Sequence, residues 1–370
     1  MLSRDADACY WIGRYVERAE ATARMVDVHY HAALESPLTA EAARAEAFGT
    51  GSEDAESDGA AGDIKADAGT SEPEDPEIST LRWQSILAIS GSGGTYRKRY
   101  ETENDRDMLH FFAFDPDHSN SILSTWKAAR DNARSIREQL ASEMWESVNV
   151  SYLRLRDWNV DRVLAGSPHE FFQIVKDSSH LFQGILNRTM LMGETRDWLD
   201  TGRFLERAGQ TARLLDVKFH DLLPAFRIPD PSSVTGASSL QDAYGVGGAL
   251  DMHGWIAVLK SVSAFEMYLK THQDGISPAN VVDFLVLNTK FPASVRHGIG
   301  RVEGCLQRIS GSTSAVPATE PERLAANLRA GLTESQPKDI ILGGLHAYLD
   351  TVQRDCGTLG NAITKTYLSY

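Results

Sequence analysis

Cysteine is scarce in this sequence, with three residues among 370, and this scarcity excludes several classes of protein. Cys9, Cys305 and Cys356 lie far apart, without the C-x-x-C spacing of zinc or redox sites. An odd number of isolated cysteines makes no disulfide framework and is typical of reduced thiols in a cytosol. No segment approaches the roughly 18 uninterrupted apolar residues of a membrane-spanning helix, and the polar start Met1–Asp5 is unlike a signal peptide. We therefore expect a cytoplasmic protein without a membrane partner.

Positive charge is also in deficit, since 37 lysines and arginines stand against 51 aspartates and glutamates, for a formal net charge of −14. No basic stripe with interleaved aromatic residues occurs, so the sequence predicts no nucleic-acid partner. HExxH, GxSxG, Walker A and dinucleotide-binding motifs are missing as well. The sequence therefore carries no signature of a known catalytic chemistry, and we expect no bound cofactor.

Most of the negative charge falls in one segment, residues 39–78, where twelve acidic residues accompany only Arg44 and Lys65. The segment contributes −10 to the formal charge and contains almost no large apolar residue, so it cannot bury enough surface to fold. We predict that it is a disordered acidic insertion. A Ser/Gly-rich stretch, residues 229–248, predicts a flexible loop. The rest of the chain, within 1–370, is expected to form a single domain.

Outside these two segments, apolar residues recur with a helical period, and sustained two-residue alternation is almost absent. The sequence therefore predicts an all-α, multi-helix bundle. Within it, residues 13–34 and 202–223 match without a gap at a constant offset of 189, starting with GRYVERA and GRFLERA. An internal duplication is the simplest account of this match, and we expect the two helices to be related by a pseudo-two-fold axis.

Each copy of the repeat carries a charged face beside its apolar stripe. The identity of the charged residues agrees between copies, whereas core residues vary, as from Met25 to Leu214. Aspartate and histidine recur at i and i+4, a spacing at which the carboxylate can hydrogen-bond the imidazole. Metal binding by these Asp–His pairs is one alternative, although the spacing differs from that of di-iron bundles. The first copy supplies Glu17, Glu20, Arg24, Asp27 and His31; the second supplies Glu206, Arg213, Asp216 and His220, and loses only the equivalent of Glu20, which is Gly209.

Three interpretations of this face stay open. The charges can form ion pairs on a solvated surface, where each pair contributes little. They can form a network of arginine, glutamate and aspartate buried between the two helices. They can also line a pocket in which Arg14, Arg24, Arg203 and Arg213 hold carboxylate or phosphate groups.

A second arginine-rich string lies in a stretch of helical period that we expect to run as one helix from about 121 to 149. Arg130, Arg134 and Arg137 are spaced i, i+4, i+7, which predicts an arginine ridge on one face of that helix. Such a ridge would complete an anion site or pair with glutamates of the repeat helices.

Four ordered strings together give a family resemblance that covers almost the whole chain. The sequence resembles the bacterial alpha-E family, an entirely helical domain of unknown function. It departs from the family pattern at Ala293, where arginine commonly follows the Phe-Pro pair. The strings are Met1-Leu2-Ser3-Arg4 with Tyr10–Glu20, Asn132–Arg137 with Ser142–Glu146, Gly202–Arg207, and Val282-Asp283-Phe284-Leu285 with Phe291-Pro292.

The resemblance implies an association, as gene neighbour or fusion partner, with circularly permuted ATP-grasp proteins and with transglutaminase-like proteins. Such an association would place the protein in amide chemistry. We expect an accessory or substrate-binding partner of an ATP-grasp-type peptide (amide) ligase system, which binds a carboxylate- or phosphate-bearing small molecule. The candidate ligand-binding residues are Arg14, Glu17, Arg18, Arg24, Arg134, Arg137, Arg203, Glu206, Arg207 and Arg213.

Two alternatives remain. The chain can be an enzyme that uses Glu17 or Glu206 as general base with arginines stabilising negative charge, which predicts a cavity and a carboxyl with a raised pKa. It can also be a structural scaffold, which predicts the same charges fully paired and no cavity.

Overall fold

The computed structural model describes residues 1–48, 83–84, 86–222, 249–312 and 317–369. These residues form helices joined by turns, and no strand occurs in any of the described segments, so the predicted all-α fold is confirmed. None of their helices combines the length and the apolar character that crossing a membrane requires.

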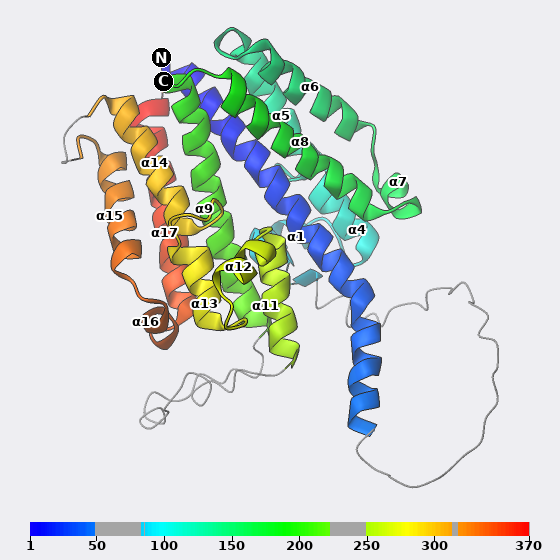
Figure 1. The fold of residues 1–370 in the computed structure, drawn as a ribbon. Helices are drawn as coiled ribbons and strands as arrows, with labels where there is room; N and C mark the ends of the chain where they lie inside the picture. The colour runs from blue at the N-terminus through cyan, green and yellow to red at the C-terminus, as the bar shows by residue number, and fades with distance from the viewer. Residues whose placement is uncertain (49–82, 85, 223–248, 313–316, 370) are drawn as a thin grey trace, which may run out of the picture.

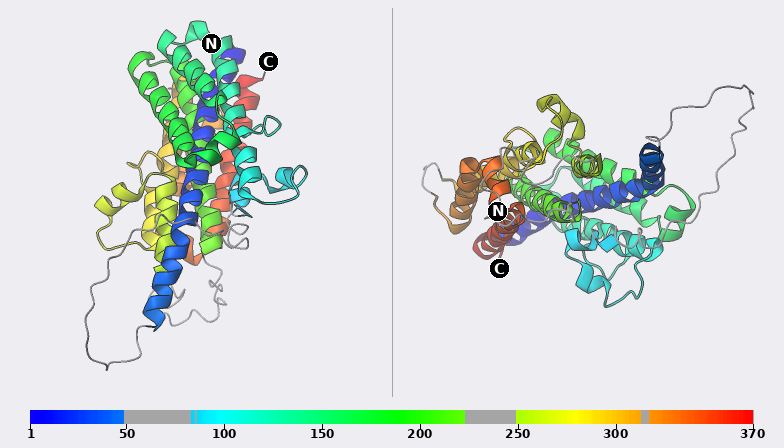
Figure 2. Two further views of the ribbon diagram at one scale, coloured as in Figure 1. Left: turned by 90° about the vertical axis from the view of Figure 1, so that its right-hand side faces the viewer. Right: turned by 90° about the horizontal axis from the view of Figure 1, so that it is seen from below.

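The architecture is two four-helix bundles that meet along one pair of long helices (Figure 1). In the first bundle, α1 contacts α5 and α8, and α6 contacts both of those; in the second, α9 contacts α14 and α17, and α15 contacts both of those. Contact between α1 and α9 joins the bundles, and the two chain ends lie close together at one end of the molecule (Figures 1 and 2). The main helices are α1 Ser3–Phe48, α5 Ile122–Ser135, α6 Ser142–Arg156, α8 Pro168–Thr189, α9 Glu194–Leu222, α14 Val295–Ser310, α15 Glu320–Glu334 and α17 Leu345–Ile363.

Helices α1 and α9 cross at two equivalent positions of the sequence repeat, Gly13 and Gly202. A Cβ atom built on Gly13 would overlap the carbonyl oxygen of Leu199, and one built on Gly202 would overlap that of Tyr10. Glycine at both positions therefore lets the two backbones touch. Because each helix presents the same face to the other, the charged residues that follow each glycine are brought together.

Shorter elements recur in the same order in both bundles. In each half, a residue with positive φ follows the helical segment that comes before these shorter elements. This residue is Gly91 (φ 64°) in the first half and Ser263 (φ 51°) in the second. A π-helical segment precedes each of α5 and α14, and a serine caps each helix, Ser121 in α5 and Ser294 in α14. The internal duplication stays a prediction, and this shared order is what it would produce. The shorter elements are α3 Gly93–Tyr96, α4 Asp105–Leu109, η1 His110–Phe114, η2 Arg137–Gln139, α7 Val160–Ala165, α11 Ala249–Ser261, α12 Phe265–Thr271, α13 Pro278–Val282, η3 Asp283–Leu287, α16 Pro337–Leu342 and η4 Thr364–Leu368.

The structure corrects two sequence-based expectations. Helix α1 continues to Phe48, so residues 39–48 of the predicted acidic insertion are helical, in keeping with the strong helix propensity of their Ala, Glu and Arg residues. Residues 49–78 and the predicted flexible loop 229–248 lie outside the described residues. The single helix expected from 121 to 149 is wrong, because the backbone leaves the helical conformation at Ile136 (φ −121°, ψ 22°) and α6 begins anew at Ser142.

Candidate functional site

Reciprocal ion pairs join α1 and α9 beside the glycine crossing. Arg14 Nε donates to Glu206 Oε2 at 2.7 Å, and Arg18 Nε donates to Glu206 Oε1 at 2.8 Å. In the opposite direction, Arg207 Nη2 donates to Glu17 Oε2 at 2.7 Å. Both glutamates are buried, with 4% and 7% of the Glu206 and Glu17 side chains exposed. We call these five residues the crossing cluster; their arrangement matches the interpretation of a buried network between the helices.

The two glutamates of the crossing cluster differ in their electrostatic surroundings. Burial acts to raise the pKa of Glu206, but the guanidinium groups of Arg14 and Arg18 hold that pKa well below its usual range. Burial raises the pKa of Glu17 above its usual value, and the charge and hydrogen bonds of Arg207 offset only part of this rise. Of the two glutamates considered as general bases, Glu17 alone has a raised pKa, and Glu206 is held as a weakly basic carboxylate.

Arg203, the equivalent of Arg14 in the second copy, does not join the crossing cluster. Its Nη2 lies 2.8 Å from Asp200 Oδ1, and its guanidinium stacks over the Phe204 ring. The first copy has Trp11 where the second has Asp200, so Arg14 has no carboxylate at i−3 and reaches Glu206 instead. This one difference leaves Glu206 with two arginines and Glu17 with one. Arg203 lines neither of the cavities described below.

Arg134 and Arg137 are exposed and line neither of the cavities described below. The break at Ile136 separates them, with Arg134 at the end of α5 and Arg137 in η2, so the predicted arginine ridge does not form. Arg130 packs elsewhere, and its Nε donates to Asn149 Oδ1 at 2.7 Å. The structure therefore places the arginines of this string outside the candidate site.

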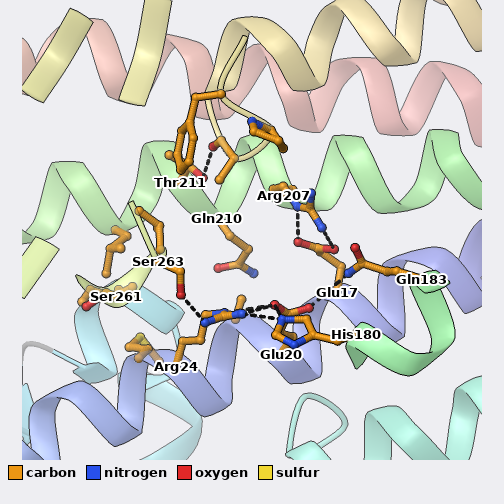
Figure 3. Close-up of a pocket in the computed structure, with 18 residues that line it drawn as sticks. Glu17, Glu20, Arg24, His180, Gln183, Arg207, Gln210, Thr211, Ser261 and Ser263 are labelled. Atoms are coloured by element: carbon orange, nitrogen blue, oxygen red, sulfur yellow. Dashed lines mark hydrogen bonds and ion pairs between the residues drawn. The ribbon is translucent and has the colours of Figure 1, made fainter. Parts of the chain in front are cut away.

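One cavity of about 230 Å³ opens beside Glu17 and Arg207, and we call it the neutral cavity (Figure 3). Glu20 and Arg24 of α1 also face it, so the described part of its lining carries two glutamates and two arginines, with His180 beside them. Its remaining lining combines amide and hydroxyl groups with an apolar wall formed by Met25, Ile89, Leu214, Val262, Phe291 and Pro292.

Glu20 is the most heavily hydrogen-bonded carboxylate of the neutral cavity. Arg24 Nη2 donates to its Oε1 at 2.6 Å, while Ser179 and Gln183 of α8 donate to its Oε2. Burial acts to raise the pKa of Glu20, but hydrogen bonds from His180 and Ser179 and the charge of Arg24 hold that pKa at about 2. Sequence reasoning missed these three α8 residues, although they form a polar stripe at 179, 180 and 183.

Glu20 should make the protein acid-sensitive. Its folded-state pKa of about 2 lies below the ordinary value of 4.5, so its contribution to stability is present above about pH 4.5 and is lost as the pH falls toward 2. This contribution is on the order of 3 kcal/mol for a shift of this size. The free energy of unfolding, measured by urea denaturation between pH 7 and pH 2, should fall less steeply with decreasing pH in Glu20→Gln than in the parent protein. Equal slopes would contradict the assignment.

A second cavity, also of about 230 Å³, lies beside Glu206, and we call it the arginine cavity. Among the described residues that line it, Arg14, Arg18 and Arg213 face the single carboxylate of Glu206. Arg213 makes no hydrogen bond or ion pair with any residue that the structure describes. Its uncharged lining includes Ser90, Ser92, His118, Asn120, Gln353 and Cys356.

The aspartates of the repeat bind histidines of other helices. His169 Nδ1 lies 3.0 Å from Asp27 Oδ1, and Lys176 Nζ donates to Asp27 Oδ2 at 2.7 Å. His346 Nδ1 lies 2.7 Å from Asp216 Oδ1 in the same way. The side chains of His31 and His220 lie outside the described residues. Within the described segments, no three His, Cys, Asp or Glu side chains gather closely enough to hold a metal ion.

Comparison with known proteins identifies the family. No curated protein and no solved structure matches the chain. The model of the Alpha-E family, described as "a predicted alpha-helical domain with a conserved ER motif", matches residues 1–368. Glu-Arg dipeptides occur at 17–18, 206–207 and 322–323, and the first two supply four of the five residues of the crossing cluster. Since the match covers essentially the whole chain, this protein belongs to the Alpha-E family.

Proposed function

We propose that this protein binds a small molecule bearing a carboxylate or phosphate in the arginine cavity, as the substrate-binding or accessory partner of an ATP-grasp-type peptide (amide) ligase system. The observation that carries the proposal is Arg213, whose guanidinium lines the cavity without a hydrogen-bonded partner among the described residues. Burial lowers its pKa, and an incoming anion would restore the lost stabilisation of its charge.

The charge balance of the arginine cavity supports an anionic ligand. In the described part of its lining there are three guanidinium groups and one carboxylate, that of Glu206, which Arg14 and Arg18 share. His118 does not add to the positive charge, because burial lowers its pKa to about 4 and leaves the ring neutral at pH 7. A cavity of about 230 Å³ lies slightly below the usual range for drug-sized ligands and fits a small metabolite.

The ligase part of the proposal rests on family membership. Amide ligation joins a carboxylate to an amine, so a site for a small carboxylate or its phosphorylated form is the chemistry that such a system needs from a binding partner. The expected partners are circularly permuted ATP-grasp-like and transglutaminase-like proteins, in the cytoplasm.

Thermal unfolding at constant ionic strength tests the ligand class. Saturating phosphate or a small carboxylate should raise the Tm of the parent protein by about 4 °C, and Arg213→Gln should abolish the rise while remaining folded. Arg134→Gln is the matched control, because Arg134 is exposed and lines neither cavity. A rise of equal size in all three proteins would mean that the anion binds elsewhere, and no rise in the parent would overturn the proposal.

A further inference from the structure

The arginine cavity and the neutral cavity share one wall. Ala21, Met25 and Gln210 line both of them, so the two spaces lie on either side of the same three side chains. Figure 3 shows Gln210 projecting from α9 toward α1, between the Glu17–Arg207 pair and the Glu20–Arg24 pair. A ligand that occupies one cavity therefore contacts side chains that also line the other.

The two cavities differ in the ligand group that each can stabilise. Three arginines and one glutamate give the arginine cavity an excess of positive charge, whereas two arginines and two glutamates balance in the neutral cavity. A carboxylate gains from the first environment and gains little from the second. The apolar wall of the neutral cavity favours instead an uncharged group with a hydrocarbon portion.

Two glutamine side chains indicate which uncharged group fits. Gln210 Nε2 donates to Glu206 Oε1 at 3.0 Å, and Gln183 Nε2 donates to Glu20 Oε2 at 3.3 Å. Because both amide nitrogens are directed to carboxylates, both carbonyl oxygens are left as acceptors, and neither accepts a hydrogen bond within the described part of the chain. A carbonyl acceptor is complementary to an N–H donor. The N–H of an amide supplies such a donor without adding charge.

We propose that the two cavities form one bipartite site for an N-acylated amino acid or short peptide. Its carboxylate occupies the arginine cavity, its amide N–H donates to the carbonyl oxygen of Gln210, and its apolar portion occupies the neutral cavity. In such a molecule the amide nitrogen is two bonds from the carboxylate carbon, which suits a residue that lines both cavities. This inference rests on the proposed function and names its substrate class.

Calorimetric titration of the full chain tests the inference with three probes. N-acetyl-L-leucine carries both parts of the ligand, acetate carries the carboxylate alone, and N-acetyl-leucinamide lacks the carboxylate. We expect N-acetyl-L-leucine to bind at least about tenfold more tightly than either of the other two, because it alone fills both cavities.

Two variants separate the cavities. Ala293 lines the neutral cavity only, so Ala293→Leu should weaken N-acetyl-L-leucine by about tenfold and leave acetate unchanged. Gln210→Met keeps the side-chain length but removes the acceptor, and should weaken N-acetyl-L-leucine about fivefold more than it weakens acetate. Ala347→Leu, on the exposed face of α17, is the matched control for the added volume.

The outcomes distinguish this inference from the function on which it rests. If Arg213→Gln weakens both acetate and N-acetyl-L-leucine while Ala293→Leu and Gln210→Met change neither, the anion site stands and the bipartite site is wrong. If no probe binds in a manner that depends on Arg213, the proposed function fails and the bipartite site fails with it.

Discussion

Replacing Gly202 with alanine should destabilise the protein by about 3 kcal/mol, since overpacking at a rigid contact typically costs this much. The added methyl group would overlap the carbonyl oxygen of Tyr10, which is backbone and cannot move aside as a flexible side chain can. The two helices would have to separate at the crossing, and the ion pairs of the crossing cluster would lengthen with them. Gly13→Ala should behave alike, because its methyl group would meet the carbonyl oxygen of Leu199.

Urea denaturation measures this effect against a matched glycine. Gly184 lies on the exposed face of α8, and a Cβ atom there meets nothing within 4 Å. Gly184→Ala should leave the free energy of unfolding unchanged or raise it by up to about 1 kcal/mol through helix propensity. If Gly202→Ala were as stable as Gly184→Ala, the close crossing of α1 and α9 would be wrong.

Replacing Glu206 with glutamine should cost about 3 kcal/mol as well, because it removes one partner of a buried ion-paired group. Arg14 and Arg18 both donate to this carboxylate, and 22% and 18% of their side chains are exposed. In the variant both guanidinium groups keep their burial without a carboxylate. Asp350→Asn is the control, since the Asp350–Arg354 pair is largely exposed and its loss should cost less than about 0.5 kcal/mol.

The same variant connects the crossing cluster to the arginine cavity. Without Glu206, the described lining of the cavity keeps three arginines and loses its carboxylate, so added phosphate should raise the Tm of Glu206→Gln more than that of the parent protein. A variant as stable as the parent in the absence of phosphate would show that the ion pairs across the helices contribute little. Equal phosphate responses would show that Glu206 does not face the bound anion.

One of the three interpretations that the sequence repeat left open, a charged network buried between the two helices, matches the contacts of the crossing cluster, for a physical reason. A surface charge tolerates substitution, whereas a glutamate that must meet an arginine on an opposing helix does not, so identity at charged positions indicates contact. Glycine at the first position of both copies adds the condition for a close approach. The sequence also contains the reason why Arg14 and Arg203 bind different partners, because only Arg203 has a carboxylate three residues earlier.

Partners from other helices left no comparable mark in the sequence. His169 and Lys176 of α8 bind Asp27 of α1 although they lie about 140 residues away in the sequence. The periodicity of α1 alone gives no indication of these partners. The predicted arginine ridge that included Arg134 and Arg137 was wrong for a different reason. The helix ends at Ile136 although neither glycine nor proline stands there. The apolar residues keep their helical period past this point, whereas the backbone does not stay helical.

The crossing of α1 and α9 is self-complementary. Each helix supplies one glycine, one glutamate acceptor and the arginine that follows it, so each half of the chain contains the donor and the acceptor of the other half. Surfaces of this kind are isologous, the type by which identical subunits form two-fold dimers. Holding both halves in one chain makes their association independent of protein concentration. Corresponding positions of the two helices can also differ within one chain, as Glu20 and Gly209 do, and these two residues line cavities of different charge.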